Sequence, residues 1–316
     1  MNIKKYRQLG LDYNLPVFLG IDDEGNEHFA DLVDLKHILM AGSTGSGKSI
    51  FGHTLIASLL SLVNPNKLKL LLVDMKCVEF TRVYNNLPCL LTKTLTDPDK
   101  VFIQLDLLAN EKKIRLKKIL RSKVDNFEEY CQQHPKENTP YIIVIIDSFS
   151  DIIIFDLLRF QKLMSQLTDN SAKTGIHLVI YDSRTGPDVF TSIIRDSFPT
   201  KICFDVCEAT YSKLIINTSG GEKLLGKGDM LLLKEGRQSP IHLQAPFISE
   251  KEIKDIVDRS KSLKKNDSIM TCYAFIIHFF SKKYMFHIWT RPYRAMDWHR
   301  SSDGRKGRLF WVERYK

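Results

Sequence analysis

Short runs of apolar residues alternate along this chain with longer segments in which apolar side chains recur every three or four positions. A strand buried on both faces reads as such a run, whereas a helix with one buried face reads as the spaced pattern. The alternation predicts an α/β fold with a mainly parallel central sheet flanked by helices. The expected strands are 36–41, 67–74, 141–146, 176–181, 200–206 and 230–233. Residues 15–21 are a candidate edge strand, which Pro16 weakens.

The longer segments carry helical periodicity. Segment 97–129 predicts one or two helices, segment 156–174 predicts another, and 250–259 predicts a short closing helix. The residues expected to face the core are Phe102, Leu105, Leu108 and Ala109 in the first, and Leu157, Leu158, Phe160, Leu163, Met164 and Leu167 in the second.

The first of these helical segments also carries a dense basic run. A run of this kind is either a solvated helix face or a contact with a nucleic-acid backbone or a neighbouring subunit. The sequence leaves both interpretations open. The residues concerned are Lys112, Lys113, Arg115, Lys117, Lys118, Arg121 and Lys123.

The net charge of +9 is confined to one end of the 316-residue chain. Residues 261–316 contain 13 Lys and Arg against 4 Asp and Glu, and they also hold all three tryptophans. This break predicts lead-in strands at 1–33, a main domain at 34–260 and a basic, aromatic-rich tail at 261–316. Cations interleaved with aromatic rings can hold single-stranded nucleic acid; the alternative is a terminus with little role.

The six cysteines are scattered and form no metal-binding pattern. We expect them to be buried free thiols in a reducing compartment, which favours a cytoplasmic location. The chain opens with a polar, basic stretch rather than a signal peptide. No apolar run approaches the roughly 20 residues that a membrane-spanning helix needs.

One glycine-rich stretch carries the strongest chemical signal. It has the form G-x-x-x-x-G-K-S, it follows an expected strand, and it precedes a helical pattern. Glycines let backbone N–H groups surround an anion, and the amino end of the helix favours negative charge. The pattern predicts an ATP site in which Lys48 reaches the phosphates and the Ser49 hydroxyl holds Mg²⁺. The nucleotide-binding residues are Gly42, Ser43, Thr44, Gly45, Ser46, Gly47, Lys48 and Ser49.

A second signal follows about a hundred residues later. The β-branched run 141–146 delivers Asp147, which is placed as a carboxylate on the Mg²⁺ side of such a site. The next residue is Ser148, where ATP-driven motors usually have a glutamate that polarises the attacking water. A serine hydroxyl cannot act as an equivalent base at neutral pH.

Taken together and in order, these motifs resemble the motor domain of the FtsK/SpoIIIE family of ring-forming DNA pumps. The resemblance covers most of residues 8–259. Each motif is weak alone, but the ordered set is specific. The matching stretches are 37–49, 72–76, 126–130, 143–147, 175–179, 187–191, 199–202, 224–230 and 240–242.

The resemblance implies a RecA-like P-loop NTPase at 34–260, a hexameric ring, ATP with Mg²⁺, and double-stranded DNA as the partner. It implies catalytic roles for Lys48, Asp147 and Arg184, and metal-side roles for Ser49 and Asp147. A short member of this kind resembles the proteins of plasmids or integrative mobile elements, with transfer or replication proteins as further partners.

Three positions depart from the family pattern. Ser148 replaces the glutamate, Ser183 replaces a glutamine before Arg184, and Lys213 lies where an arginine reaches a neighbour's nucleotide. Either the nucleotide is bound well and hydrolysed slowly, or Glu79 or Asp151 supplies the missing carboxylate. The alternatives to a DNA translocase are therefore a nucleotide-gated DNA-binding module with little hydrolysis, and a protein-export motor like those of type VII secretion, which share the fold.

Overall fold

The computed structural model describes residues 13–170 and 172–262. The lead-in before residue 13 and nearly all of the basic tail, 263–316, lie outside the described residues. The strands are β1 (Pro16–Ile21), β2 (Glu27–Asp31), β3 (Ile38–Ala41), β4 (Leu68–Asp74), β5 (Tyr141–Asp147), β6 (Ile176–Asp182), β7 (Thr200–Phe204), β8 (Asp229–Leu233) and β9 (Ile241–Gln244). The α-helices are α2 (Leu32–Leu35), α3 (Lys48–Leu62), α4 (Pro98–Ser122), α5 (Phe127–Gln133), α6 (Ser150–Thr168), α7 (Ser192–Ser197), α8 (Ala209–Ile216) and α9 (Glu250–Ser262).

All of these strands join one sheet in the order β2-β1-β9-β8-β7-β3-β6-β5-β4. The five strands from β7 to β4 run parallel, as the alternating pattern predicts. Beyond β7 the order continues through β8, β9, β1 and β2, and each of these pairs antiparallel with its neighbour. The α/β fold is confirmed, with an antiparallel flank added to its parallel core.

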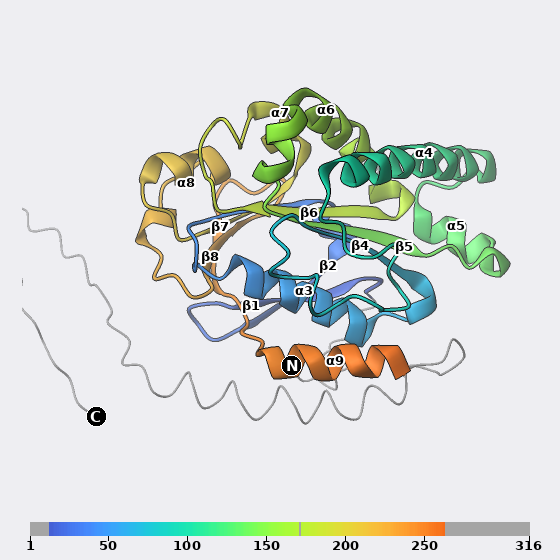
Figure 1. Cartoon of the computed structure of the whole chain (residues 1–316), viewed down its shortest axis with the longest axis horizontal. Helices are drawn as coiled ribbons and strands as arrows, with labels where there is room; N and C mark the ends of the chain where they lie inside the picture. The colour runs from blue at the N-terminus through green and yellow to red at the C-terminus, as the bar shows by residue number, and fades with distance from the viewer. Residues whose placement is uncertain (1–12, 171, 263–316) are drawn as a thin grey trace, which may run out of the picture.

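Helices cover both faces of the sheet (Figure 1). Helices α4, α6 and α7 lie on one face, while α3 and α9 lie on the other. Each face has its own apolar core: one packs the α3 and α9 side against β1, and the other packs the α4 and α6 side against β5 and β6. None of the helices in the described part combines the length and apolarity that a bilayer crossing requires.

Some sequence-based expectations are wrong in detail. Strand β1 is not an edge strand, because β2 lies outside it and Pro16 occupies only its first position. Helix α6 begins at Ser150 rather than at 156, and it is interrupted at Asp156, where φ is −158° and ψ is 91°. Leu158 lies two positions before the buried Phe160, on the outer face of the helix, so its side chain is 77% exposed instead of buried.

The cysteine and basic-run expectations also need correction. The five described cysteines are free thiols, but Cys77 and Cys207 are exposed rather than buried. Within the basic run on α4, Lys112 and Arg115 are buried against the rest of the domain. These two cations therefore belong to neither a solvated face nor a surface for nucleic acid.

Candidate functional site: a phosphate-binding loop at the carboxyl ends of the strands

The glycine-rich loop joins the end of β3 to the start of α3, as the sequence predicts. Its turn depends on two glycines in left-handed conformations, Gly45 at φ 80° and Gly47 at φ 114°. A Cβ atom on Gly47 would lie 2.5 Å from the backbone nitrogen of Gly228. Any side chain there would force the loop away from its neighbour, so glycine is required for both conformation and space.

Two distant segments hold this loop in place. The Ser43 N–H donates to the carbonyl of Asp205 at 2.7 Å, and the Gly228 N–H donates to the carbonyl of Ser46 at 2.7 Å. The supporting turn at Gly226–Gly228 belongs to stretch 224–230 of the family resemblance, and the sequence alone assigns it no structural role. Its glycine spacing was the only sequence signal, and its contact with the loop depends on the fold.

Lys48 lies at the first position of α3 with its side chain buried. Its ammonium donates to the carbonyls of Gly42 at 2.7 Å and Ser43 at 2.9 Å. Burial lowers the pKa of Lys48 to about 8, while the nearby charges of Asp182 and Asp147 act in the opposite direction. A phosphate group would add a strong anionic partner for this cation.

Asp147 ends β5, beside Asp74 of β4 and Tyr181 of β6 in the sheet register. Burial raises the pKa of Asp147 to about 7, and a hydrogen bond from Ser148 opposes that rise. The Ser148 hydroxyl donates to Asp147 Oδ1 at 3.1 Å, and Ser148 itself has a φ of 55°. The serine at the family's glutamate position thus contacts the predicted metal-side carboxylate.

Arg184 lies at the rim of this region rather than against the loop. Its guanidinium Nη2 is 3.4 Å from Asp151 Oδ1, and its side chain is 55% exposed. The Lys76 ammonium lies 3.8 Å from the other oxygen of Asp151. The Arg184 backbone N–H donates to the buried carboxylate of Asp182, which also accepts the N–H of Ser150. Lys213, which stands where the family has an arginine, is exposed on α8.

Glu79 is brought to the loop from the segment after β4. The pKa of the Glu79 carboxyl is held below its usual range by His53 and, to a smaller extent, by the neighbouring Ser49 hydroxyl. The ring nitrogen Nε2 of His53, one helical turn after Ser49, lies 3.3 Å from Glu79 Oε2. The sequence left the choice between Glu79 and Asp151 open, and the fold places Glu79 against the residue predicted to hold Mg²⁺.

The donor set at this site suits Mg²⁺, which prefers oxygen ligands and usually keeps several waters. Ser49 offers a hydroxyl and Asp147 a carboxylate. Two buried hydroxyls beside them, Tyr181 Oη and Ser150 Oγ, have no hydrogen-bond partner among the described residues. The described part of the chain holds no cluster of three His, Cys, Asp or Glu side chains that would bind a metal unaided. These residues therefore fit an ion that arrives with a nucleotide.

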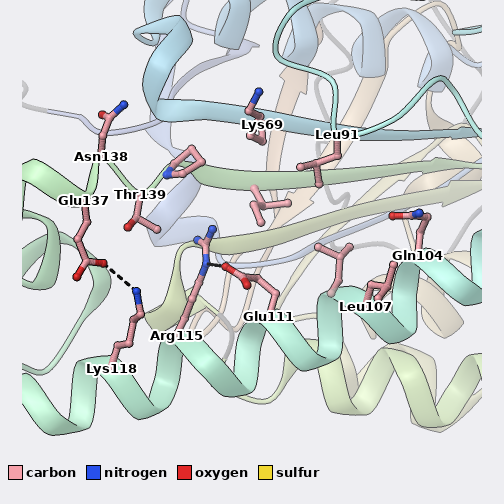
Figure 2. A pocket seen from close by; sticks show the side chains of 13 residues that line it. Lys69, Leu91, Gln104, Leu107, Glu111, Arg115, Lys118, Glu137, Asn138 and Thr139 are labelled. Atoms are coloured by element: carbon pink, nitrogen blue, oxygen red, sulfur yellow. Dashed lines mark hydrogen bonds and ion pairs between the residues drawn. The ribbon is translucent and has the colours of Figure 1, made fainter.

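A cavity of about 690 Å³ lies elsewhere, between α4 and the amino ends of β4 and β5. Figure 2 shows the Arg115–Glu111 and Lys118–Glu137 ion pairs on its wall. No predicted nucleotide-binding or catalytic residue lines it. The phosphate-binding loop and this cavity are separate features at opposite ends of the sheet.

The strand order, the loop between β3 and α3, and Asp147 at the end of β5 define the class of P-loop NTPases. A sequence profile of the FtsK/SpoIIIE family matches residues 11–187. The chain belongs to the FtsK/SpoIIIE family.

Curated relatives agree with this assignment. The chain is 38% identical over 265 residues to the DNA translocase FtsK of Caldanaerobacter subterraneus subsp. tengcongensis, covering 84% of this chain and 36% of the relative. It is 37% identical over 254 residues to the DNA translocase FtsK of Helicobacter pylori, covering 79% and 30%. The chain thus spans about a third of the length of these relatives.

Solved structures give the same fold. The conjugation coupling protein TcpA of pCW3, in its monomer form with ATPgS, is similar with a TM-score of 0.70 and 26% identity, over 79% of this chain and 71% of that one. The cytoplasmic domain of the type VII secretion ATPase EccC from Thermomonospora curvata is similar with a TM-score of 0.65 at 18% identity, over 81% of this chain and 32% of that one. At that identity the second likeness concerns the fold alone.

Proposed function

We propose that this chain is the ATP-hydrolysing motor of a DNA translocase or coupling ATPase that moves double-stranded DNA. The observation that carries the proposal is the loop geometry: the buried Lys48 ammonium is held by the carbonyls of Gly42 and Ser43 at the end of β3, and Asp147 ends β5 at the same edge of the sheet. Membership of the FtsK/SpoIIIE family implies that the chain binds a nucleotide. The assignment of DNA as the substrate rests on relatives that are described as DNA translocases.

In this proposal the residues of the site have separate roles. The backbone N–H groups of residues 42–49 surround the phosphates, and Lys48 neutralises charge on the transferred group. Ser49 and Asp147 hold Mg²⁺, which stabilises charge that develops on the phosphate oxygens. Arg184, at the rim, faces a neighbouring subunit or the nucleotide's outer side in a hexameric ring.

Ser148 makes hydrolysis slow. Its hydroxyl is engaged with Asp147, and it lacks the carboxylate that would orient a water for attack. This contact supports a second candidate, a nucleotide-gated DNA-binding module with little turnover. The likeness to the conjugation coupling protein TcpA supports a role in the transfer of a plasmid or integrative element. The likeness to EccC concerns the fold, so it does not favour protein export.

An ATPase assay titrated with duplex DNA tests the proposal. We expect turnover to rise at least severalfold with DNA and to vanish in Lys48→Ala, which loses the cation that meets the phosphates. The variant Lys254→Ala, at an exposed position of α9 outside the basic run, is the matched control for removing a lysine. Nucleotide binding and DNA binding without stimulated turnover would favour the gated module. Nucleotide binding unaffected by Lys48→Ala would overturn both.

A further inference from the structure

Two carboxylates lie near the site without a role in the family pattern, and their surroundings differ. Asp151 is already matched to cations, since Arg184 and Lys76 lie 3.4 and 3.8 Å from its two oxygens. Glu79 has no such pairing with lysine or arginine among the described residues; its contacts are Ser49 and His53. Glu79 is therefore the carboxylate available to a cation that enters with the nucleotide.

Glu79 is held in place from the helix that carries the phosphate-binding loop. Ser49 and His53 are four residues apart on α3, so their side chains share one face of that helix. Hydrogen bonds from His53 and Ser49 hold the pKa of the Glu79 carboxyl below its usual range. The Glu79 side chain is 27% exposed, which leaves it accessible from the site while its partners fix it.

The His53 ring is itself locked by a second partner. The ring is buried, and its Nδ1 lies 2.8 Å from the hydroxyl of Tyr84, a side chain that is 1% exposed. With Nε2 donating to the Glu79 carboxylate, Nδ1 is the bare nitrogen and accepts the Tyr84 O–H. The Phe80 ring packs edge-on against His53 at 5.6 Å. A buried chain from Tyr84 through His53 to Glu79 thus orients one carboxylate beside Ser49.

A second observation places the same region on the metal side. The Tyr181 hydroxyl is buried without a hydrogen-bond partner among the described residues. It lies 3.0 Å from the Cβ position of Gly52 on α3, and burial followed by the charges of Asp147 and Glu79 raises its pKa. Buried hydroxyls are normally satisfied by protein or ordered water. Tyr181 is also the register partner of Asp147, so its hydroxyl lies between the end of β5 and the helix that carries Ser49 and His53.

We propose that Glu79 is an outer-sphere carboxylate for Mg²⁺, accepting hydrogen bonds from the waters of the ion, with His53 and Tyr84 as its positioning residues. The inference rests on the proposed nucleotide-binding function and deepens it. Mg²⁺ keeps several waters in nucleotide sites, and groups that hold such waters typically change metal affinity 10- to 100-fold. Glu79 does not replace the missing glutamate at 148. Its neighbours are His53 and Ser49 on α3, so it lies on the side of the site where Ser49 is proposed to hold Mg²⁺.

Binding of the slowly hydrolysed analogue ATPγS, measured over a Mg²⁺ series and in excess EDTA, tests the role of Glu79. Mg²⁺ should increase the affinity for ATPγS. For Glu79→Gln we expect the Mg²⁺ concentration that gives half of this increase to rise at least tenfold. Binding in EDTA should be unchanged or tighter, because a negative charge near the phosphates is gone. Tyr84→Phe, which removes one hydroxyl, should give a shift of about threefold in the same direction. Glu250→Gln, on an exposed surface of α9, is the matched control.

The possible outcomes distinguish a failure of the proposed function from a failure of the role proposed for Glu79. If the wild type fails to bind ATPγS, the proposed function and this inference both fall. If the wild type binds and Glu79→Gln keeps the wild-type Mg²⁺ dependence, only this inference is overturned. Equal weakening with and without Mg²⁺ would show that Glu79 merely supports the loop, and it would also overturn the inference.

Discussion

The buried charged side chains at the two ends of the parallel strands differ in their partners. At the carboxyl ends, the Lys48 ammonium donates to neutral carbonyls, and Asp147 accepts from a neutral hydroxyl. At the amino ends, Arg115 of α4 has a carboxylate of its own, since its Nε lies 2.8 Å from Glu111 Oε1. Arg115 also donates to the carbonyl of Thr174 at 3.1 Å and packs over the Phe127 ring at 5.1 Å.

This difference separates structural charges from functional ones. A buried ion that has its own counterion is complete within the fold, and removing it costs stability. Lys48 and Asp147 have only neutral hydrogen-bond partners, and burial lowers the pKa of Lys48 to about 8 and raises that of Asp147 to about 7. For these two residues, which meet at the carboxyl edge of the sheet, we expect the charges of a ligand to complete the site. Phosphates and Mg²⁺ are the charges that match these two residues.

The largest expected effect follows from breaking the amino-end arrangement. Arg115→Ala removes a buried guanidinium with three partners, and we expect a loss of about 2–3 kcal/mol in the free energy of unfolding. Urea denaturation followed by circular dichroism measures it. At a temperature where the variant remains folded, ATPγS affinity should stay at the wild-type value.

Lys117→Ala provides the comparison on the same helix. Lys117 is exposed, so we expect a change within about 0.5 kcal/mol. If the two variants were equally stable, Arg115 would not be a structural cation. The distinction between the two ends of the sheet would then fail at its amino end.

A smaller effect should follow from restoring the missing carboxylate at the carboxyl end. Ser148→Glu places a base beside Asp147, and we expect DNA-stimulated ATP turnover to rise about tenfold, since positioned bases contribute roughly 10²–10⁴-fold when optimally placed. Ser148 already adopts a φ of 55° with a Cβ atom, so the substitution introduces no new backbone strain. Steady-state phosphate release measures the rate.

Ser148→Gln is the matched control, because it has the same size without the charge. It should leave turnover low while keeping ATPγS affinity. If Ser148→Glu folds and binds the analogue but hydrolyses no faster than Ser148→Gln, slow chemistry does not originate at position 148. In that case the exposed Lys213 becomes the position to exchange for arginine.

The sequence predicted local features well and distant contacts poorly. Strands β4, β5 and β6 begin and end within one residue of the predictions, because a continuous apolar run is a local signal. The loop conformation was predictable for the same reason. The burial of Arg115 depends on Thr174, which lies 59 residues away, and no local pattern in a basic run reveals it. The position of Glu79 likewise depends on His53, 26 residues away.

The smallest expected effect lies in the antiparallel flank, which supports the site from outside the parallel core. His242 of β9 contacts Asp229 of β8 through Nε2 at 2.6 Å and Asp23 of the β1–β2 turn through Nδ1 at 2.9 Å. Hydrogen bonds with Asp229 and then Asp23 raise the pKa of His242 to about 9, against the opposing effect of burial. Asp229 also accepts the Leu225 N–H at the start of the turn that reaches Ser46.

The sign of the resulting pH dependence follows from that raised pKa. A histidine whose folded pKa exceeds its unfolded value of about 6.5 contributes its full stability below that value and loses it as pH rises through about 9. The His242 side chain is 41% exposed, so we expect a contribution below about 1 kcal/mol. Comparing wild type with His242→Asn by urea denaturation between pH 6 and pH 10 should show the difference shrinking with rising pH. A constant difference across that range would mean that His242 contributes packing rather than charge, and that the flank supports the loop without an ionic link.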